Sequence, residues 1–120
     1  MRRLYLETSV WGVLADDQPI EMQRATLQLL ARLRRRQACI SQVVLDEIAA
    51  ADEDARNSIN DALLRHSPVV LDVSAECREL AIAFLEAGVL PAKKREDALH
   101  VAVSTVHEID VLVSLKNSPE

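Results

Sequence analysis

The stretch Leu4–Trp11, which reads LYLETSVW, determines how the rest of this chain is interpreted. Its apolar start, Leu4–Leu6, favours a strand, and apolar residues then recur at helical spacing from Val10. The pattern predicts a strand, a sharp turn and a helix. Ligands of open parallel sheets bind at the carboxyl ends of the strands, so Glu7 would stand at the functional edge of such a sheet.

The turn has a second interpretation, in which Glu7, Thr8 and Ser9 only cap the helix. Hydroxyl groups satisfy the unpaired amides of a first helical turn, and a carboxylate suits the positive end of the helix dipole. Taken alone, the stretch favours capping. A functional role for Glu7 needs support from the rest of the chain.

Length and composition limit what the chain can be. Its 120 residues are enough for one compact domain and too few for two ordinary ones, so we expect a single domain over residues 1–120. Hydrophobic residues make up 49% and aromatic residues 2%, which predicts a core of Ala, Leu, Val and Ile. The net charge of −5 argues against a broad basic surface for nucleic acid, but it allows an acidic pocket that holds divalent cations.

Cysteine usage and hydropathy bear on the compartment. Cys39 and Cys77 belong to no paired-cysteine motif, which predicts buried free thiols in a reducing environment. No apolar run approaches the roughly 18 residues of a membrane span, and the N-terminus lacks a signal-peptide core. We therefore expect a cytoplasmic protein with no membrane partner.

Predicted strands and helices alternate along the chain. Strands are expected at residues 3–6, 38–40, 69–73 and 111–115, and helices around Trp11 and at 20–35, 42–49, 55–66, 75–87 and 96–106. Connections of these lengths suit right-handed crossovers. The order predicts an α/β protein with three α/β/α layers and a central parallel sheet of four or more strands.

Apolar spacing assigns the inward face of each helix, and serines mark helix starts. Ser41 and Ser74 are the predicted N-caps. The residues expected to face inward are Val44, Leu45, Ile48 and Ala49, then Ile59, Leu63 and Leu64, and finally Ala98, Leu99, Ala102 and Val106. On helix 42–49, Asp46 points away from the apolar face and Glu47 lies on its border, from which it can reach the same edge as Glu7.

Three acids from separate segments are thereby candidates for one site: Glu7, Glu47 and Asp97. Carboxylates brought together repel one another, and a fold tolerates this mainly when a cation neutralises them. Oxygen ligands favour Mg²⁺ or Mn²⁺ over Zn²⁺. Such a cluster can activate water and stabilise the charge that develops on a phosphate, although the spacing alone is a weak signal.

Three motifs, Leu4–Gly12, Ser41–Ile48 and Asp97–Ala102, resemble in this order the successive motifs of the PIN-domain family. That family includes the VapC-type ribonuclease toxins of bacterial toxin–antitoxin pairs. The resemblance spans nearly the whole chain. It implies a PIN-like α/β/α fold, cleavage of single-stranded RNA that depends on Mg²⁺ or Mn²⁺, and a small cognate antitoxin as an inhibiting partner.

Carried over residue by residue, the resemblance places Glu7, Glu47 and Asp97 on the catalytic, metal-binding acids of the family. Thr8 or Ser9 falls on the hydroxyl beside the first acid. The first acid is more often Asp in the family, and Glu7 adds one methylene group.

The C-terminus departs further from the family pattern. Relatives usually carry Asp or Asn just after the strand expected at 111–115 and often continue through another helix and strand. Here Lys116 stands at that position, unless Asn117 takes the role after a shift of one residue. We therefore expect a C-terminus that is short for the family and an exposed edge strand, which invites pairing in a homodimer.

The basic run before Asp97 and the histidine after it can each be interpreted in two ways. Lys93, Lys94 and Arg95 precede Asp97 and either grip substrate phosphates or form a solvated loop. His100 either donates a hydrogen bond to Asp97 or is a packed or surface-flank histidine.

Three functions are compatible with the sequence. The first is a toxin-class ribonuclease, which the acids favour. The second is a catalytically impaired PIN-like protein that binds an antitoxin, RNA or itself, which Lys116 favours. A weaker third is an acidic signalling domain with a phosphoacceptor, which the position of Glu7 argues against because such domains carry Asp after a central strand.

Overall fold

The computed structural model describes residues 2–13, 20–32, 36–88 and 95–115. Its strands are β1 (Arg2–Leu6), β2 (Arg36–Ser41), β3 (Val69–Leu71) and β4 (Val111–Val113). Its helices are α1 (Thr8–Gly12), α2 (Ile20–Ala31), α3 (Gln42–Ala49), α4 (Glu53–His66), α5 (Ala75–Glu86) and α6 (Arg95–Val106).

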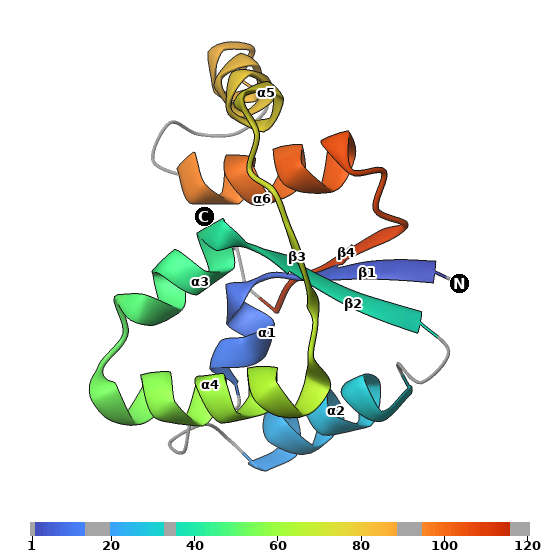
Figure 1. The fold of residues 1–120 in the computed structure, drawn as a ribbon, viewed down its shortest axis with the longest axis vertical. Helices are drawn as coiled ribbons and strands as arrows, with labels where there is room; N and C mark the ends of the chain where they lie inside the picture. Colours follow the sequence, from blue (N-terminus) through green and yellow to red (C-terminus); the bar gives the residue numbers. More distant parts are fainter. Residues whose placement is uncertain (1, 14–19, 33–35, 89–94, 116–120) are drawn as a thin grey trace.

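The strands form one parallel sheet in the order β3-β2-β1-β4 (Figure 1). The register pairs Tyr5 of β1 with Cys39 of β2 on one side and with Leu112 of β4 on the other. Helices cover both faces of β1, so Leu4–Leu6 is an unbroken apolar run and is buried throughout. Every connection between neighbouring parallel strands crosses over through helix.

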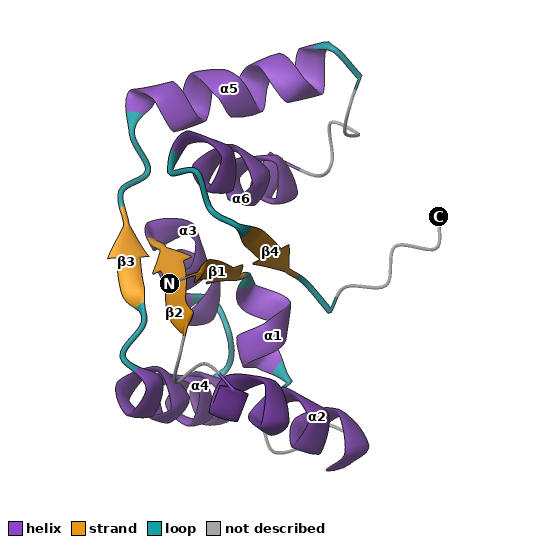
Figure 2. Ribbon diagram, turned by 90° about the vertical axis from the view of Figure 1, so that its right-hand side faces the viewer, coloured by secondary structure: helices purple, strands orange, loops and turns teal. Residues whose placement is uncertain are grey.

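The helices lie on both sides of the sheet, as Figure 2 shows. Helices α5 and α6 pack together on one face, while α1, α2 and α4 lie on the other. Helix α3 continues directly from β2 and contacts α1, α4 and α6. This arrangement confirms the predicted α/β/α layers and the four-stranded parallel sheet.

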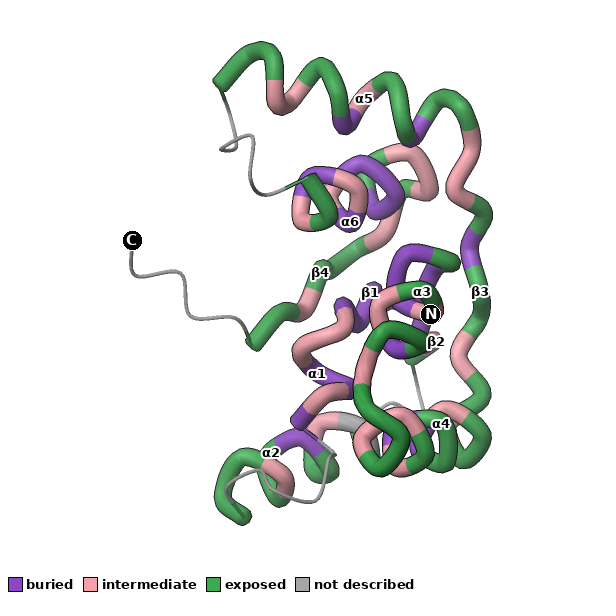
Figure 3. Tube along the Cα trace, turned by 90° about the vertical axis from the view of Figure 1, so that its left-hand side faces the viewer, coloured by how far each residue is buried: buried purple, intermediate pink, exposed green. Residues whose placement is uncertain are grey.

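Two apolar clusters hold these layers together, and the buried residues line the inner surfaces of the elements in Figure 3. The main cluster surrounds β1 and β2, and its largest fully buried side chains are Trp11 and Tyr5. The Trp11 indole N–H donates to the carbonyl of Leu6 at 3.0 Å, so its polar atom is satisfied inside the core. The small residues Ala81, Ala98 and Ala102 let α5 and α6 approach closely.

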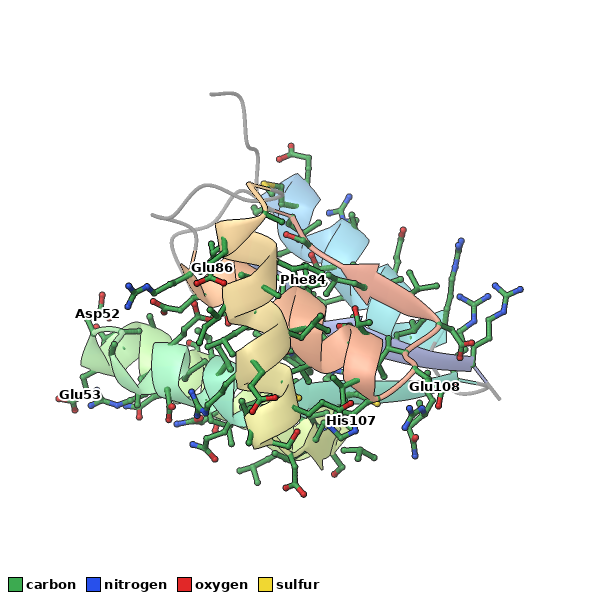
Figure 4. The ribbon with its side chains drawn as sticks, turned by 90° about the horizontal axis from the view of Figure 1, so that it is seen from above. Asp52, Glu53, Phe84, Glu86, His107 and Glu108 are labelled. Carbon is green, nitrogen blue, oxygen red and sulfur yellow. The ribbon has the colours of Figure 1, made fainter. Side chains whose placement is uncertain are left out.

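The caps follow the predicted local chemistry. The side chain of Ser41 accepts from the Val43 amide at 3.2 Å, and that of Ser74 accepts from the Cys77 amide at 3.3 Å. Helix α4 begins two residues before its expected start because Asp52 accepts from the Ala55 amide at 2.9 Å. Figure 4 shows Asp52 and Glu53 at one end of α4, on the opposite side of the view from His107 and Glu108.

Two residues expected in the core are exposed instead. Leu64 of α4 is 79% exposed, and Ala49 at the end of α3 is exposed too. On α4 the buried residues are Ile59 and Ala62, so the covered stripe is narrower than the apolar pattern. On α3 the buried residues are Val43, Val44 and Ile48, so Val43 is covered and Ala49, the last residue of the helix, is not. Periodicity gives the direction of a face but not the extent of its neighbours.

The remaining expectations concern edges, thiols and membranes. Val111 and Leu112 of β4 are exposed at one edge of the sheet, as predicted. Cys39 and Cys77 are buried and free. Within the described ranges, helices are all too short or too polar to cross a bilayer.

Candidate functional site

The carboxyl ends of β1, β2 and β4 meet at one edge of the sheet, where polar residues gather. Glu7 follows β1 and Ser114 follows β4, and the Ser114 hydroxyl donates to Glu7 Oε1 at 3.1 Å. The amide of Leu115 donates to the Ser9 hydroxyl at 2.8 Å. These bonds join the turn after β1 to the end of β4. The edge of the sheet that was predicted to be functional is therefore held together by side-chain hydrogen bonds.

Glu7 is 3% exposed, and its two carboxylate oxygens have different surroundings. Oε1 caps α1 by accepting from the Ser9 amide at 2.9 Å, and it also accepts from the hydroxyls of Ser9 and Ser114. Oε2 is buried and has no hydrogen-bond partner among the described residues. The capping interpretation is therefore correct for one oxygen, while the other remains available to a ligand.

Glu47 lies beside this turn, with its side chain 19% exposed. Its Oε1 accepts from the Thr8 hydroxyl on α1 and from His100 Nε2 on α6 at 2.8 Å. Thr8 directly follows Glu7, so the turn that carries the first predicted acid also donates a hydrogen bond to the second. Three helices, α1, α3 and α6, thus converge on the Glu47 carboxylate.

A buried hydrogen-bond chain lies behind Glu47. His100 Nδ1 is 2.7 Å from the Tyr5 hydroxyl, which is 2.7 Å from the Ser41 hydroxyl. Tyr5, Ser41 and His100 are all buried. Of the two alternatives for His100, the packed histidine is correct: His100 turns inward from α6 and meets Glu47, an acid of α3.

Burial and hydrogen bonding act in opposite directions on the pKa of Glu47. Burial raises it, but the hydrogen bonds with His100, Thr8 and Glu96 and the charge of His100 together lower it by more. The carboxyl group is therefore ionised at neutral pH. Burial raises the pKa of Tyr5 beyond its ordinary range, so the phenol keeps its proton.

Asp97 lies in the first turn of α6 and is partly buried. Its neighbour Glu96 lines a pocket of about 230 Å³ together with Glu47 and Asp46 of α3. Arg78 of α5 lines the same pocket, so one cation faces several acids there. Neither Glu96 nor Arg78 was identified from the sequence, because helical spacing does not reveal which helices share a pocket.

The acids do not form a complete metal cluster in this structure. Among the described residues, no three His, Cys, Asp or Glu side chains are grouped so as to hold an ion. The donor chemistry nevertheless suits a hard divalent cation, because Glu7 Oε2 is a buried carboxylate oxygen that has no partner among the described residues. Leaving such an atom unsatisfied is costly, and an ion would satisfy it.

Several predicted residues cannot be placed. Lys93, Lys94, Lys116 and Asn117 lie outside the described residues. Arg95 begins α6 and is exposed. At the end of β4, the residue that contacts Glu7 is Ser114, which sequence comparison passed over because the family pattern directs attention to an acid or amide.

Comparisons with known proteins identify the fold. No family model and no curated protein matches the chain. Among solved structures, VapC20 of Mycobacterium tuberculosis, a sarcin-ricin loop cleaving toxin, matches with a TM-score of 0.70 at 20% identity, over 94% of this chain and 89% of that one.

Two further structures are similar. VapBC2 from Rickettsia felis, bound to a DNA fragment from their promoter, gives a TM-score of 0.65 at 21% identity, over 95% of this chain and 87% of that one. A toxin–antitoxin complex from Klebsiella pneumoniae gives 0.66 at 15% identity, over 96% and 99%. At these identities the likeness establishes the fold.

Proposed function

We propose that this chain, which has the VapC-type PIN fold, is a divalent-metal-dependent endoribonuclease of a toxin–antitoxin pair. The observation that carries the proposal is the unpartnered, buried Oε2 of Glu7. It lies where the carboxyl ends of the parallel strands meet, and the next residue, Thr8, donates to the Glu47 carboxylate, whose pKa is lowered by its hydrogen bonds and by the charge of His100. A bound ion would explain a buried carboxylate oxygen without a hydrogen-bond partner better than helix capping alone does.

Glu7 and Glu47 would hold Mg²⁺ or Mn²⁺, with Asp97 contributing from the first turn of α6 and Thr8 or Ser9 as accessory ligands. The bound ion would supply a Lewis acid that activates water and stabilises charge on the phosphate. The chain's own residues orient the acids: Ser9 fixes Glu7, and Thr8 fixes Glu47.

Single-stranded RNA is the proposed substrate. Arg78 would bind a phosphate in the pocket beside Glu47, because a guanidinium offers paired donors to phosphate oxygens. Lys93, Lys94 and Arg95 are proposed to bind further phosphates. We expect Arg78→Ala to raise KM more than it lowers kcat.

An antitoxin partner, a homodimer and a cytoplasmic location are proposed as well. Two of the similar structures are a VapBC pair and a toxin–antitoxin complex, which supports a cognate antitoxin here. The exposed β4 edge supports a homodimer. Buried free thiols support a cytoplasmic location.

Cleavage of mixed single-stranded RNA in Mg²⁺ or Mn²⁺ tests the activity. We expect EDTA, Glu7→Gln and Asp97→Asn each to abolish cutting. The matched control is Asp61→Asn, which makes the same change at an exposed position of α4. Cutting by wild type that survives EDTA, or equal cutting by wild type and Asp97→Asn, would contradict the proposal.

A PIN-like protein that binds without cutting is the second candidate. It is favoured by the lack of a three-ligand group in the described part of the chain. Such a protein would bind an antitoxin, RNA or a second copy of itself. Wild type that shows no metal-dependent cutting while it still binds one of these partners would support this candidate.

A further inference from the structure

We propose that the buried chain Ser41–Tyr5–His100 is a positioning device that holds the Glu47 carboxylate in place for a divalent cation. The inference rests on the proposed function, since it assigns a role at the same site. His100 is the positioning residue that touches Glu47, and Tyr5 and Ser41 hold its ring from behind.

The geometry of the chain is continuous from core to site. Ser41 is anchored because its hydroxyl accepts from the Val43 amide. Distances of 2.7, 2.7 and 2.8 Å then join Ser41 to Tyr5, Tyr5 to His100 and His100 to Glu47. Each member comes from a different element, so the chain fixes α3 and α6 relative to β1 at the edge where the acids gather.

The direction of the hydrogen bonds follows from the donors available. Because the ionised Glu47 carboxylate can only accept, a neutral His100 carries its proton on Nε2, toward Glu47, and its Nδ1 accepts from the Tyr5 hydroxyl. A cationic ring carries a proton on Nε2 as well. In either state the ring donates to the Glu47 carboxylate, and the hydroxyl of Tyr5 has a role that Phe could not fill.

His100 is 2% exposed, so it does not reach a substrate. Its role must act through Glu47, which is the one partly exposed member of the network. Carboxylates that bind ions are commonly oriented by such outer hydrogen bonds. A purely structural role would be filled more cheaply by apolar side chains of the same volume, because every polar member of a buried network must be satisfied.

Mn²⁺ binding followed by electron paramagnetic resonance, without RNA, tests the proposal. His100→Leu removes the donor, and we expect it to weaken Mn²⁺ binding by about 10- to 100-fold. His100→Gln places an amide donor near the position of Nε2 and should restore most of the affinity. His107→Gln is the control, because His107 bonds the carbonyl of Asp72 instead. Thermal unfolding in EDTA reports whether each variant folds.

Tyr5→Phe keeps the inference testable should His100→Leu fail to fold, because it removes a single oxygen atom. We expect a smaller loss of affinity in this variant. In wild type, ¹⁵N NMR of the imidazole should show a slowly exchanging proton on Nε2 of His100. A ring without a proton on Nε2 would overturn the inference.

The outcomes separate the two proposals. If wild type binds Mn²⁺ and the folded variants of His100 and Tyr5 bind it equally well, the positioning role is wrong and the proposed nuclease stands. If wild type neither binds Mn²⁺ nor cuts RNA, the proposed function fails and this inference fails with it. Weaker binding in His100→Leu, recovered in His100→Gln, supports both.

Discussion

At the scale of single residues, Glu7 shows how one side chain can fill a structural and a functional role. One carboxylate oxygen caps α1 and accepts hydrogen bonds from two hydroxyl groups. The other is buried without a hydrogen-bond partner in the described part of the chain. Stability alone does not explain the second oxygen, since an unsatisfied buried acceptor costs free energy. Residues that break a local rule in this way are expected at functional sites.

Cation binding at Glu7 predicts a stability effect that needs no substrate. Mn²⁺ at about 100 times its Kd should raise the free energy of unfolding of wild type by about 2.7 kcal/mol. Glu7→Gln removes the charge and should lose this increment, whereas Asp61→Asn should keep it. Urea unfolding with and without Mn²⁺ measures the effect, and equal stabilisation of Glu7→Gln would count against Glu7 as a ligand.

The lowered pKa of Glu47 predicts how its contribution depends on pH. Because its folded pKa lies below the ordinary 4.5, its stabilising contribution is complete above pH 4.5 and is lost as pH falls through the folded pKa. The stability difference between wild type and Glu47→Gln in EDTA should therefore shrink with acid. Urea unfolding at neutral pH and at acid pH tests this. A difference that grows as pH falls would show that the sign is wrong.

At the scale of elements, the contact between α5 and α6 places the acids of α6. Ala81 of α5 is buried with Ala98 and Ala102 of α6 in one small apolar cluster. The same helix carries Asp97 in its first turn and His100 on its inward face. The seating of α6 on its neighbours thus controls both the network behind Glu47 and the position of Asp97.

Enlarging Ala102 should disturb that seating. Ala102→Leu is expected to lower the free energy of unfolding by about 1–3 kcal/mol, because overpacking forces the helices apart. Ala83→Leu is the control, since Ala83 lies on the exposed side of α5. Urea unfolding compares the two variants, and equal stabilities would show that the helices have room to adjust.

At the scale of the whole molecule, the sheet ends in an exposed strand. β4 pairs with β1 on one side, and Leu112 in its middle is 36% exposed. Apolar side chains of α2, namely Ile20, Met22 and Leu27, are exposed as well. Exposed strand edges with apolar side chains are places where another chain can add.

A lysine on this strand tests whether the edge mediates dimerisation. Leu112→Lys should shift a dimer toward monomer, because charged side chains at an edge oppose strand pairing. Leu64→Lys, at an exposed position of α4, is the control. Sedimentation velocity of both variants and wild type provides the measurement. A dimer that survives Leu112→Lys would move the interface away from β4.

The sequence by itself determined the features that depend on neighbours along the chain. Alternating strands and helices and the caps at Ser41 and Ser74 appeared as predicted, and the order of motifs predicted the PIN-type fold. Local hydrogen bonding and apolar periodicity carry this information. Glu7, Glu47 and Asp97 were proposed as a group from the same patterns, and their joint role stays a prediction.

The tertiary structure alone decided which side chains meet. It placed His100 against Glu47 instead of Asp97, exposed Leu64, and brought Ser114 to Glu7. Each outcome depends on how helices from distant parts of the chain pack on the sheet, and a difference of a fraction of a turn changes the partner. Patterns along a sequence give the face of an element, but only packing decides what covers that face.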